Sequence, residues 1–181
     1  MRVGDDDVLQ LGDPGLRRMA TSVEAPRDEC FRRQVARLHH ALAAFRREHG
    51  FGRAIAAPQI GVGLRFIALD LDDEFGPQTI VNPRVTWRSD ERFTLWDDCM
   101  SFPSLLVRVE RHAAITVEHL DLEGRARTWE IEDRAVSELL QHEIDHLDGV
   151  LAVDRATGVN PLVSRDVFES MSSYFADRVG A

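Results

Sequence analysis

The feature that most restricts this chain is a pair of histidines four residues apart. His142 and His146 lie in the segment His-Glu-Ile-Asp-His at 142–146, and the apolar residues before it recur at helical spacing, which predicts a helix over about 133–147. Side chains four apart share one helix face, so both imidazoles can reach a single ion. Zinc-type ions bind imidazole nitrogen at about 2.0–2.1 Å, so this pair would form two corners of a tetrahedron. The segment predicts a metal site, although a helix with two ordinary surface histidines has the same pattern.

Two acidic residues accompany these histidines. Glu143 directly follows the first one, and in such an arrangement a carboxylate can take a proton from water activated by the metal. Asp145 either orients an imidazole or is a solvated surface charge. We expect the solvated charge.

The two histidines leave a third protein ligand to be found. Ala152 stands where a metzincin-like protease would carry a further histidine. Glu169 is the candidate for a thermolysin-like protease, and Cys99 is the other choice because a thiolate binds zinc-type ions at about 2.3 Å. The residues by themselves leave both choices open.

Hydrophobic periodicity predicts an α+β fold with an antiparallel or mixed sheet. We expect the whole chain, 1–181, to form a single domain packed around the helix that carries the two histidines. The expected elements are an extended segment with a turn (8–20), helices (29–48, 133–147 and a C-terminal one at 163–175), a loop (50–63), and strands (64–71, 78–87, 93–100, one or two within 107–120, and 127–131).

Composition excludes several kinds of protein. The 22 Lys and Arg residues against 31 Asp and Glu give a net charge of −9, which argues against direct nucleic-acid recognition. No apolar run approaches the roughly 20 residues of a membrane helix, and residues 1–7 are acidic and unlike a signal peptide. We therefore expect a cytoplasmic protein with no membrane contact. Cys30 is expected to have no chemical role.

Three segments resemble the motifs of the peptide deformylase family. Residues 141–149 (Gln-His-Glu-Ile-Asp-His-Leu-Asp-Gly) are similar to its histidine motif, and 95–103 (Leu-Trp-Asp-Asp-Cys-Met-Ser-Phe-Pro) to its cysteine motif. Residues 52–61 (Gly-Arg-Ala-Ile-Ala-Ala-Pro-Gln-Ile-Gly) resemble its glycine motif, and 11–17 resemble its N-terminus. All stand in the family's order, so the resemblance covers about residues 8–155 and favours Cys99 as the third ligand.

The resemblance implies a metal-dependent hydrolase that removes an N-terminal formyl group, as formate, from formyl-methionyl peptides or nascent chains. It implies that Cys99, His142 and His146 bind one divalent ion, natively Fe²⁺, with Zn²⁺, Ni²⁺ or Co²⁺ as substitutes. Glu143 would be the general base. The Gln59 amide and the Met100 backbone N–H would donate hydrogen bonds to the oxyanion.

The chain departs from the family pattern around the expected substrate pocket, for which we name Gly52, Arg53, Ala54, Asp97 and Glu138. Ala54 replaces a glycine, which would matter if that position needed a positive φ or a close backbone approach. Arg53 stands where an aliphatic residue is usual. We expect Arg53 and Glu138 to rim the cleft, with their charges in water. If instead they face the substrate, the enzyme would be specialised for an N-formyl substrate other than formyl-methionine.

Asp97 and Asp98 replace the Glu-Gly of the cysteine motif. Asp97 keeps the carboxylate, whereas Asp98 adds a charge beside Cys99.

A catalytically silent homologue that binds nascent chains is the remaining alternative, and the intact ligand residues argue against it. The expected partner is an N-formylated peptide or nascent chain, with transient ribosome contact as a family expectation that the short, non-basic tail at 175–181 does not strengthen.

Overall fold

A computed structural model describes residues 8–71 and 76–176 of the chain. Its helices, strands and short 3-10 helices follow one another as η1 (Pro14–Arg17), α1 (Glu29–His49), β1 (Ala54–Ala56), η2 (Ala57–Ile60), β2 (Phe66–Leu69), β3 (Gln78–Arg88), β4 (Arg92–Asp98), β5 (Leu105–His112), β6 (Ile115–Leu120), β7 (Ala126–Ile131), α2 (Arg134–Leu147), η3 (Ala152–Arg155), β8 (Leu162–Ser164), α3 (Arg165–Ser170) and α4 (Ser172–Ala176). The predictions for residues 1–7 and for the tail after 176 lie outside the described residues.

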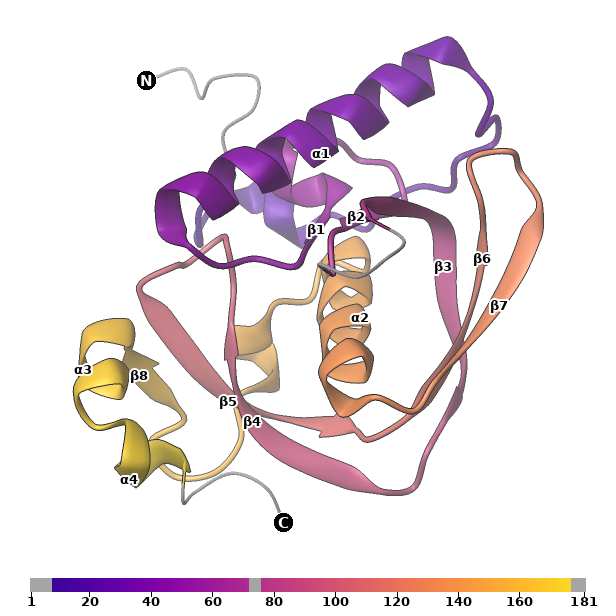
Figure 1. The fold of residues 1–181 in the computed structure, drawn as a ribbon. Coiled ribbons are helices and arrows are strands. Elements are labelled where there is room, and N and C mark those ends of the chain that lie inside the picture. The colour runs from indigo at the N-terminus through magenta and orange to yellow at the C-terminus, as the bar shows by residue number, and fades with distance from the viewer. Residues whose placement is uncertain (1–7, 72–75, 177–181) are drawn as a thin grey trace.

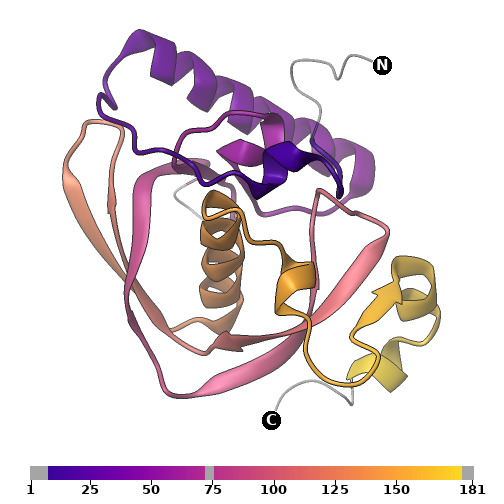
Figure 2. The same ribbon diagram turned by 180° about the vertical axis from the view of Figure 1, so that it is seen from behind.

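The strands form two antiparallel sheets that surround α2 (Figure 1). One sheet has the order β1-β2-β3-β6-β7, and the other has the order β4-β5-β8. Helix α1 lies across the first sheet at the top of Figure 1, while α2 stands in the middle, and the view from behind shows the same enclosure (Figure 2). The predicted α+β class with a central helix is therefore confirmed.

Both long helices begin and end as their sequences specify. Asp28 caps α1 by accepting hydrogen bonds from two backbone N–H groups of the first turn, and Asp133 does the same for α2. Helix α1 ends at Gly50, whose φ of 77° is the left-handed conformation that glycine adopts without strain. After α2, Gly149 has a φ of 74°, and an added Cβ there would lie 2.6 Å from the Arg17 carbonyl oxygen. Glycine is therefore required where the chain turns from α2 against the N-terminal segment.

Helix α2 is buried along most of its length, from Ser137 to Leu147. Its apolar residues pack against the five-stranded sheet, in a cluster that includes Ile67, Ile115 and Leu140. The polar side chains of a buried helix need hydrogen-bonding partners, because an unsatisfied polar group loses its hydration. Gln141 meets this need by donating to the His112 carbonyl oxygen at 2.9 Å and accepting from the His112 N–H at 3.1 Å.

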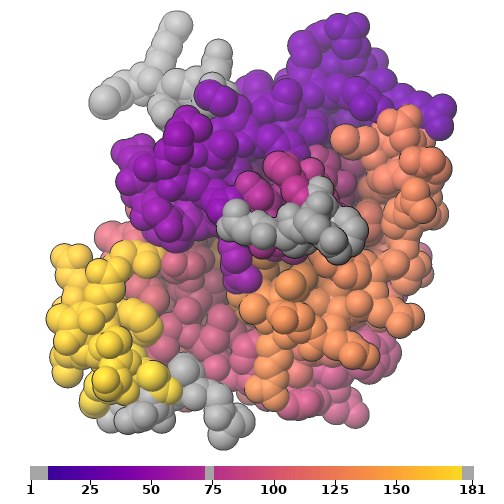
Figure 3. All heavy atoms as spheres, in the orientation of Figure 1, coloured from indigo at the N-terminus to yellow at the C-terminus, as the bar shows by residue number. Residues whose placement is uncertain are grey.

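Three element predictions differ from the structure. The segment predicted as a loop at 50–63 contains β1 and the 3-10 helix Ala57–Ile60, because its small residues pair with β2 and pack in the buried cluster that includes α2. The single strand expected over 64–71 is shorter, at Phe66–Leu69. The C-terminal helix is present, but it begins at Arg165 after β8 and is interrupted at Met171, which separates α3 from α4. Figure 3 shows this C-terminal segment, in yellow, beside the strands of the smaller sheet and below α1.

None of the helices in the described ranges combines the length and the apolar character needed to cross a bilayer.

Candidate metal centre

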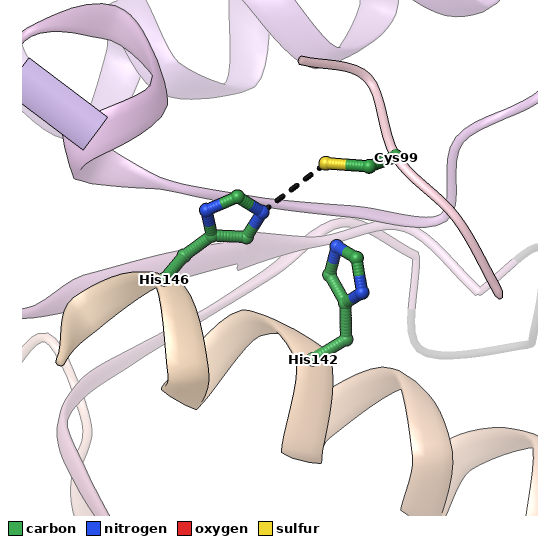
Figure 4. A group of neighbouring side chains, drawn as sticks. All are labelled: Cys99, His142 and His146. Carbon is green, nitrogen blue, oxygen red and sulfur yellow. Dashed lines mark hydrogen bonds between the residues drawn. The ribbon is translucent and has the colours of Figure 1, made fainter. Parts of the chain in front are cut away.

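Cys99, His142 and His146 converge although 43 residues separate the cysteine from the first histidine. Their ligand atoms all lie within 4.8 Å of one another. Figure 4 shows both imidazoles rising from α2 toward the thiol, which comes from the turn after β4. The Cys99 Sγ lies 3.2 Å from the His146 Nε2. In a tetrahedral site with bonds of about 2.0–2.3 Å, ligand atoms stand roughly 3.3–3.8 Å apart, so the three residues could hold one metal ion.

The chemistry of these donors fits a cation. Burial raises the pKa of the Cys99 thiol, so a thiolate at this position needs a positive charge beside it. Burial, followed by the charge of His142, lowers the pKa of His146 well below its usual value. This direction favours the neutral imidazole that binds a metal ion.

Asp97 holds the ring of His142 in place. Its Oδ2 lies 2.9 Å from the His142 Nδ1, which leaves Nε2 facing the cluster. A carboxylate on the far nitrogen of a ligating histidine fixes the ring's orientation and tautomer. Although burial alone would raise the pKa of Asp97, His142 and Arg111 lower it below the usual value. Asp97 was expected in a substrate pocket with Arg53 and Glu138. All three residues line one cavity of about 350 Å³, but the hydrogen bonds of Asp97 are with His142 and Arg111.

Glu143 lies beside the cluster with an unsatisfied oxygen. It is 3% exposed, and its Oε2 is buried without a hydrogen-bond partner. Burial raises the pKa of Glu143 to about 7. A carboxylate that titrates near neutrality is suited to exchange protons with a reacting water and a leaving amine.

The side chain of Gln59 faces the cysteine. Its Oε1 accepts a hydrogen bond from the Ala56 N–H at 2.8 Å, which turns the amide group toward the Cys99 Sγ, 3.7 Å away, and the Ser101 Oγ, 3.3 Å away. Met100 follows Cys99 in the same turn and is buried. The structure thus places the amide of Gln59 beside Cys99, the residue that Met100 follows in the chain.

Arg111 is a buried arginine beside the centre, and the sequence analysis missed it. It is 3% exposed and places its Nη1 2.5 Å from the Asp145 Oδ2 and its Nη2 3.1 Å from the Asp97 Oδ2. The expectation that Asp145 is a solvated charge is therefore wrong, since Asp145 is buried and also accepts two hydrogen bonds from Arg155. A signal existed, because Arg111 shares the alternating buried face of its strand with Val107 and Val109.

The structure shows where the side chains lie that depart from the family's motifs around the expected pocket. Ala54 has no positive φ and pairs with Leu69 in β1, so its methyl group causes no backbone strain; the positive φ, of 109°, belongs to Gly52. Asp98 pairs with Arg165, 2.7 Å away. Arg53 is partly exposed, but Glu138 is only 9% exposed, so the expectation that both side chains rim the cleft is wrong for Glu138.

The protease alternative fails on geometry. Glu169 lies exposed on α3 and is not part of the cluster that Cys99 forms with the two histidines. Cys30 is exposed at the start of α1 and lies far along the chain from the cluster.

Residues 6–161 match the family model described as polypeptide deformylase. The chain belongs to the peptide deformylase family. A peptide deformylase of Rhizobium meliloti is 41% identical over 150 residues, which are 81% of this chain and 82% of that protein. The crystal structure of the deformylase from Thermotoga maritima superposes with a TM-score of 0.73 at 32% identity, covering 83% of this chain and 97% of the other. The crystal structure of a Synechococcus elongatus deformylase in complex with actinonin gives a TM-score of 0.75 at 28% identity, covering 94% of this chain and 85% of the other.

This family consists of metal-dependent hydrolases, and the chain carries a cluster able to bind the metal. The resemblance seen in the three sequence motifs is confirmed.

Proposed function

We propose that this protein hydrolyses the formamide bond of N-formylated peptides and nascent chains, formyl-methionyl ones included, releasing formate and a free amine. The observation that carries the proposal is the buried cluster of Cys99, His142 and His146, with the unsatisfied Glu143 carboxylate beside it.

We further propose that residues 1–181 form one deformylase-like domain. We also propose that the protein acts in the cytoplasm, where nascent chains are made.

The metal ligands in this proposal are Cys99, His142 and His146. Fe²⁺ is the proposed native ion because the resemblance to the family implies it. Zn²⁺, Ni²⁺ or Co²⁺ could substitute, because a donor set of one thiolate and two imidazoles suits all four. When bound, the ion supplies Lewis-acid activation of water and of the formyl carbonyl.

The residues around the cluster have two roles, proton transfer and stabilisation of the developing negative charge. Glu143 accepts a proton from the attacking water and passes it to the nitrogen as the C–N bond breaks, so one water is consumed for each formate and amine released. The Gln59 amide and the Met100 backbone N–H donate hydrogen bonds to the oxygen that gains negative charge. The support for Gln59 is its fixed orientation, with the amide nitrogen toward Cys99.

The test is formate release by the purified full-length chain, loaded with Fe²⁺ under anaerobic conditions or with Zn²⁺, using formyl-Met-Ala-Ser. We expect formate from the wild type and little from Cys99→Ala. Binding of the peptide with no formate from any N-formyl substrate would instead support a silent binding protein. Transient ribosome contact is a separate proposal, tested by cosedimentation with ribosomes.

A further inference from the structure

Arg165, the first residue of α3, contacts three separate segments of the chain at the edge of the metal centre. Its Nη2 lies 2.7 Å from the Asp98 Oδ2, and its Nε donates to the Pro103 carbonyl oxygen at 2.7 Å. Its guanidinium carbon stands over the Phe51 ring, 4.2 Å from the ring centre, well within the roughly 6 Å at which a cation is attracted to an aromatic face. One side chain thus joins the segment after α1 to the end of β4 and to the turn after Cys99.

Two of the three segments border the cavity of about 350 Å³ into which the metal cluster faces. Most of the cavity's lining is buried, and its remaining residues form what we call the mouth: Arg46, Gly50, Phe51, Gly52, Arg53 and Asp98. The described residues that line the cavity do not include Arg165. Any effect of Arg165 on a bound substrate therefore passes through Phe51 and Asp98.

A peptide substrate must leave the cavity through this mouth. In the proposed function, on which this inference rests, the formyl group lies beside the metal cluster at the buried end. Each residue of an extended peptide adds about 3.3–3.6 Å to its length, so the cavity cannot enclose a nascent chain. The residues that follow the first one therefore pass the mouth, where one part of the lining comes from residues 46–53 and the other from Asp98.

The geometry of the guanidinium suits it to hold these two parts together. Its planar fork donates to two acceptors while its face covers an aromatic ring, which a point charge such as an ammonium group does not reproduce. Phe51 and Asp98 lie far apart in the sequence, so local structure does not fix their spacing. The side chains of Arg165 and Asp98 are 24% and 40% exposed, and partly exposed pairs contribute little to stability. A loss of this bridge should therefore appear in the kinetics more than in the stability.

We propose that Arg165 is a positioning residue of this enzyme. It holds Phe51 and Asp98 at a fixed spacing, so that the residues after the substrate's first side chain bind along the mouth while the formamide lies at the metal cluster. Arg165 lies beyond residues 6–161, which match the family model. The C-terminal segment, shown in yellow in Figure 3, thus supplies a residue on which the site depends.

The experiment measures kcat and KM of the metal-loaded full chain on formyl-Met-Ala-Ser and on formyl-methionine amide, which ends at the first residue. We expect Arg165→Met to lower kcat/KM for the tripeptide about tenfold, chiefly through KM, and to change that for the amide less than about threefold. Arg165→Lys should lose about as much as Arg165→Met, because it keeps the charge but not the fork. Full activity of Arg165→Lys would show that charge alone suffices and would overturn the inference.

A double-mutant cycle tests whether the effect passes through Asp98. Asp98→Ala removes one end of the bridge, so the double variant with Arg165→Met should be no poorer on the tripeptide than Arg165→Met alone. Losses that simply multiply would contradict the bridge. This cycle and Arg165→Lys decide the question even if Arg165→Met does not fold, which circular dichroism would show.

The matched control is Arg84→Met, which breaks an exposed ion pair with Glu118 on the five-stranded sheet, outside the cavity's described lining. It should leave the kinetics on both substrates unchanged. An Arg165→Met variant with no loss, or with equal losses on the tripeptide and the amide, would overturn the inference and leave the proposed function standing. No formate from the wild type would refute the proposed function and this inference together.

Discussion

Replacing Arg111 with methionine tests whether the buried charge network stabilises the fold. Arg111 is 3% exposed and lies between Asp97 and Asp145. Methionine keeps much of the side-chain length but removes the positive charge. Removing one partner of a buried ion pair typically costs about 3–5 kcal/mol, because the other charge is left buried and uncompensated.

The lower part of that range is expected here. Asp145 keeps a second arginine, since the Arg155 Nη2 lies 2.6 Å from its Oδ1. Of the two ion-pair partners that the described residues give Asp97, the variant would leave His142. We therefore expect Arg111→Met to lower the free energy of unfolding by about 3 kcal/mol. For a chain of this size, that corresponds to a fall in Tm of about 6–12 °C.

The assay is urea unfolding followed by circular dichroism, with Arg92→Met as control. Arg92 lies on the neighbouring strand and pairs with Glu110 at 2.8 Å, but both side chains are about half exposed. Exposed pairs contribute at most about 1 kcal/mol. If Arg111→Met destabilised the protein no more than Arg92→Met does, the argument from buried charge would be refuted.

Four further predictions concern the metal centre. Cys99→Ala should lose the bound metal, measured by mass spectrometry, whereas Cys30→Ser should retain it, because only Cys99 faces the histidines. Glu143→Gln should keep the metal and lower kcat by about 10²–10⁴; an unchanged kcat would exclude its role as base. Gln59→Leu should lower kcat by about 10²–10³ in the same formate assay, and a loss confined to KM would contradict oxyanion stabilisation. The pKa of Asp97 is lower in the folded protein than its usual 3.8, so its contribution to stability should be present above about pH 4 and be lost as the pH falls through the folded value. Unfolding measured between pH 2 and 6 should show a flatter acid decline for Asp97→Asn.

Local patterns in the sequence were sufficient for most elements. The spacing of apolar residues and the capping residue placed α1 within one residue of its observed end, and the helix that carries His142 begins one residue after the predicted start. The segment after α1 was harder because its alanines have weak strand propensity and no alternation. Its strand conformation depends on the backbone pairing of Ala54 with Leu69, which no local pattern encodes.

The sequence by itself determined the types of group available for catalysis. The four-residue spacing on one helix required that His142 and His146 share a face, and the motif order indicated that Cys99 belongs with them. Only the tertiary structure decided which charges accompany them. It buried Asp145 rather than exposing it, placed Arg111 between two carboxylates, and turned Glu138 into the cavity beside Arg53. The physical reason is that burial and charge pairing depend on how sheets and helices pack over long separations in the chain, whereas helix periodicity depends on neighbours a turn away.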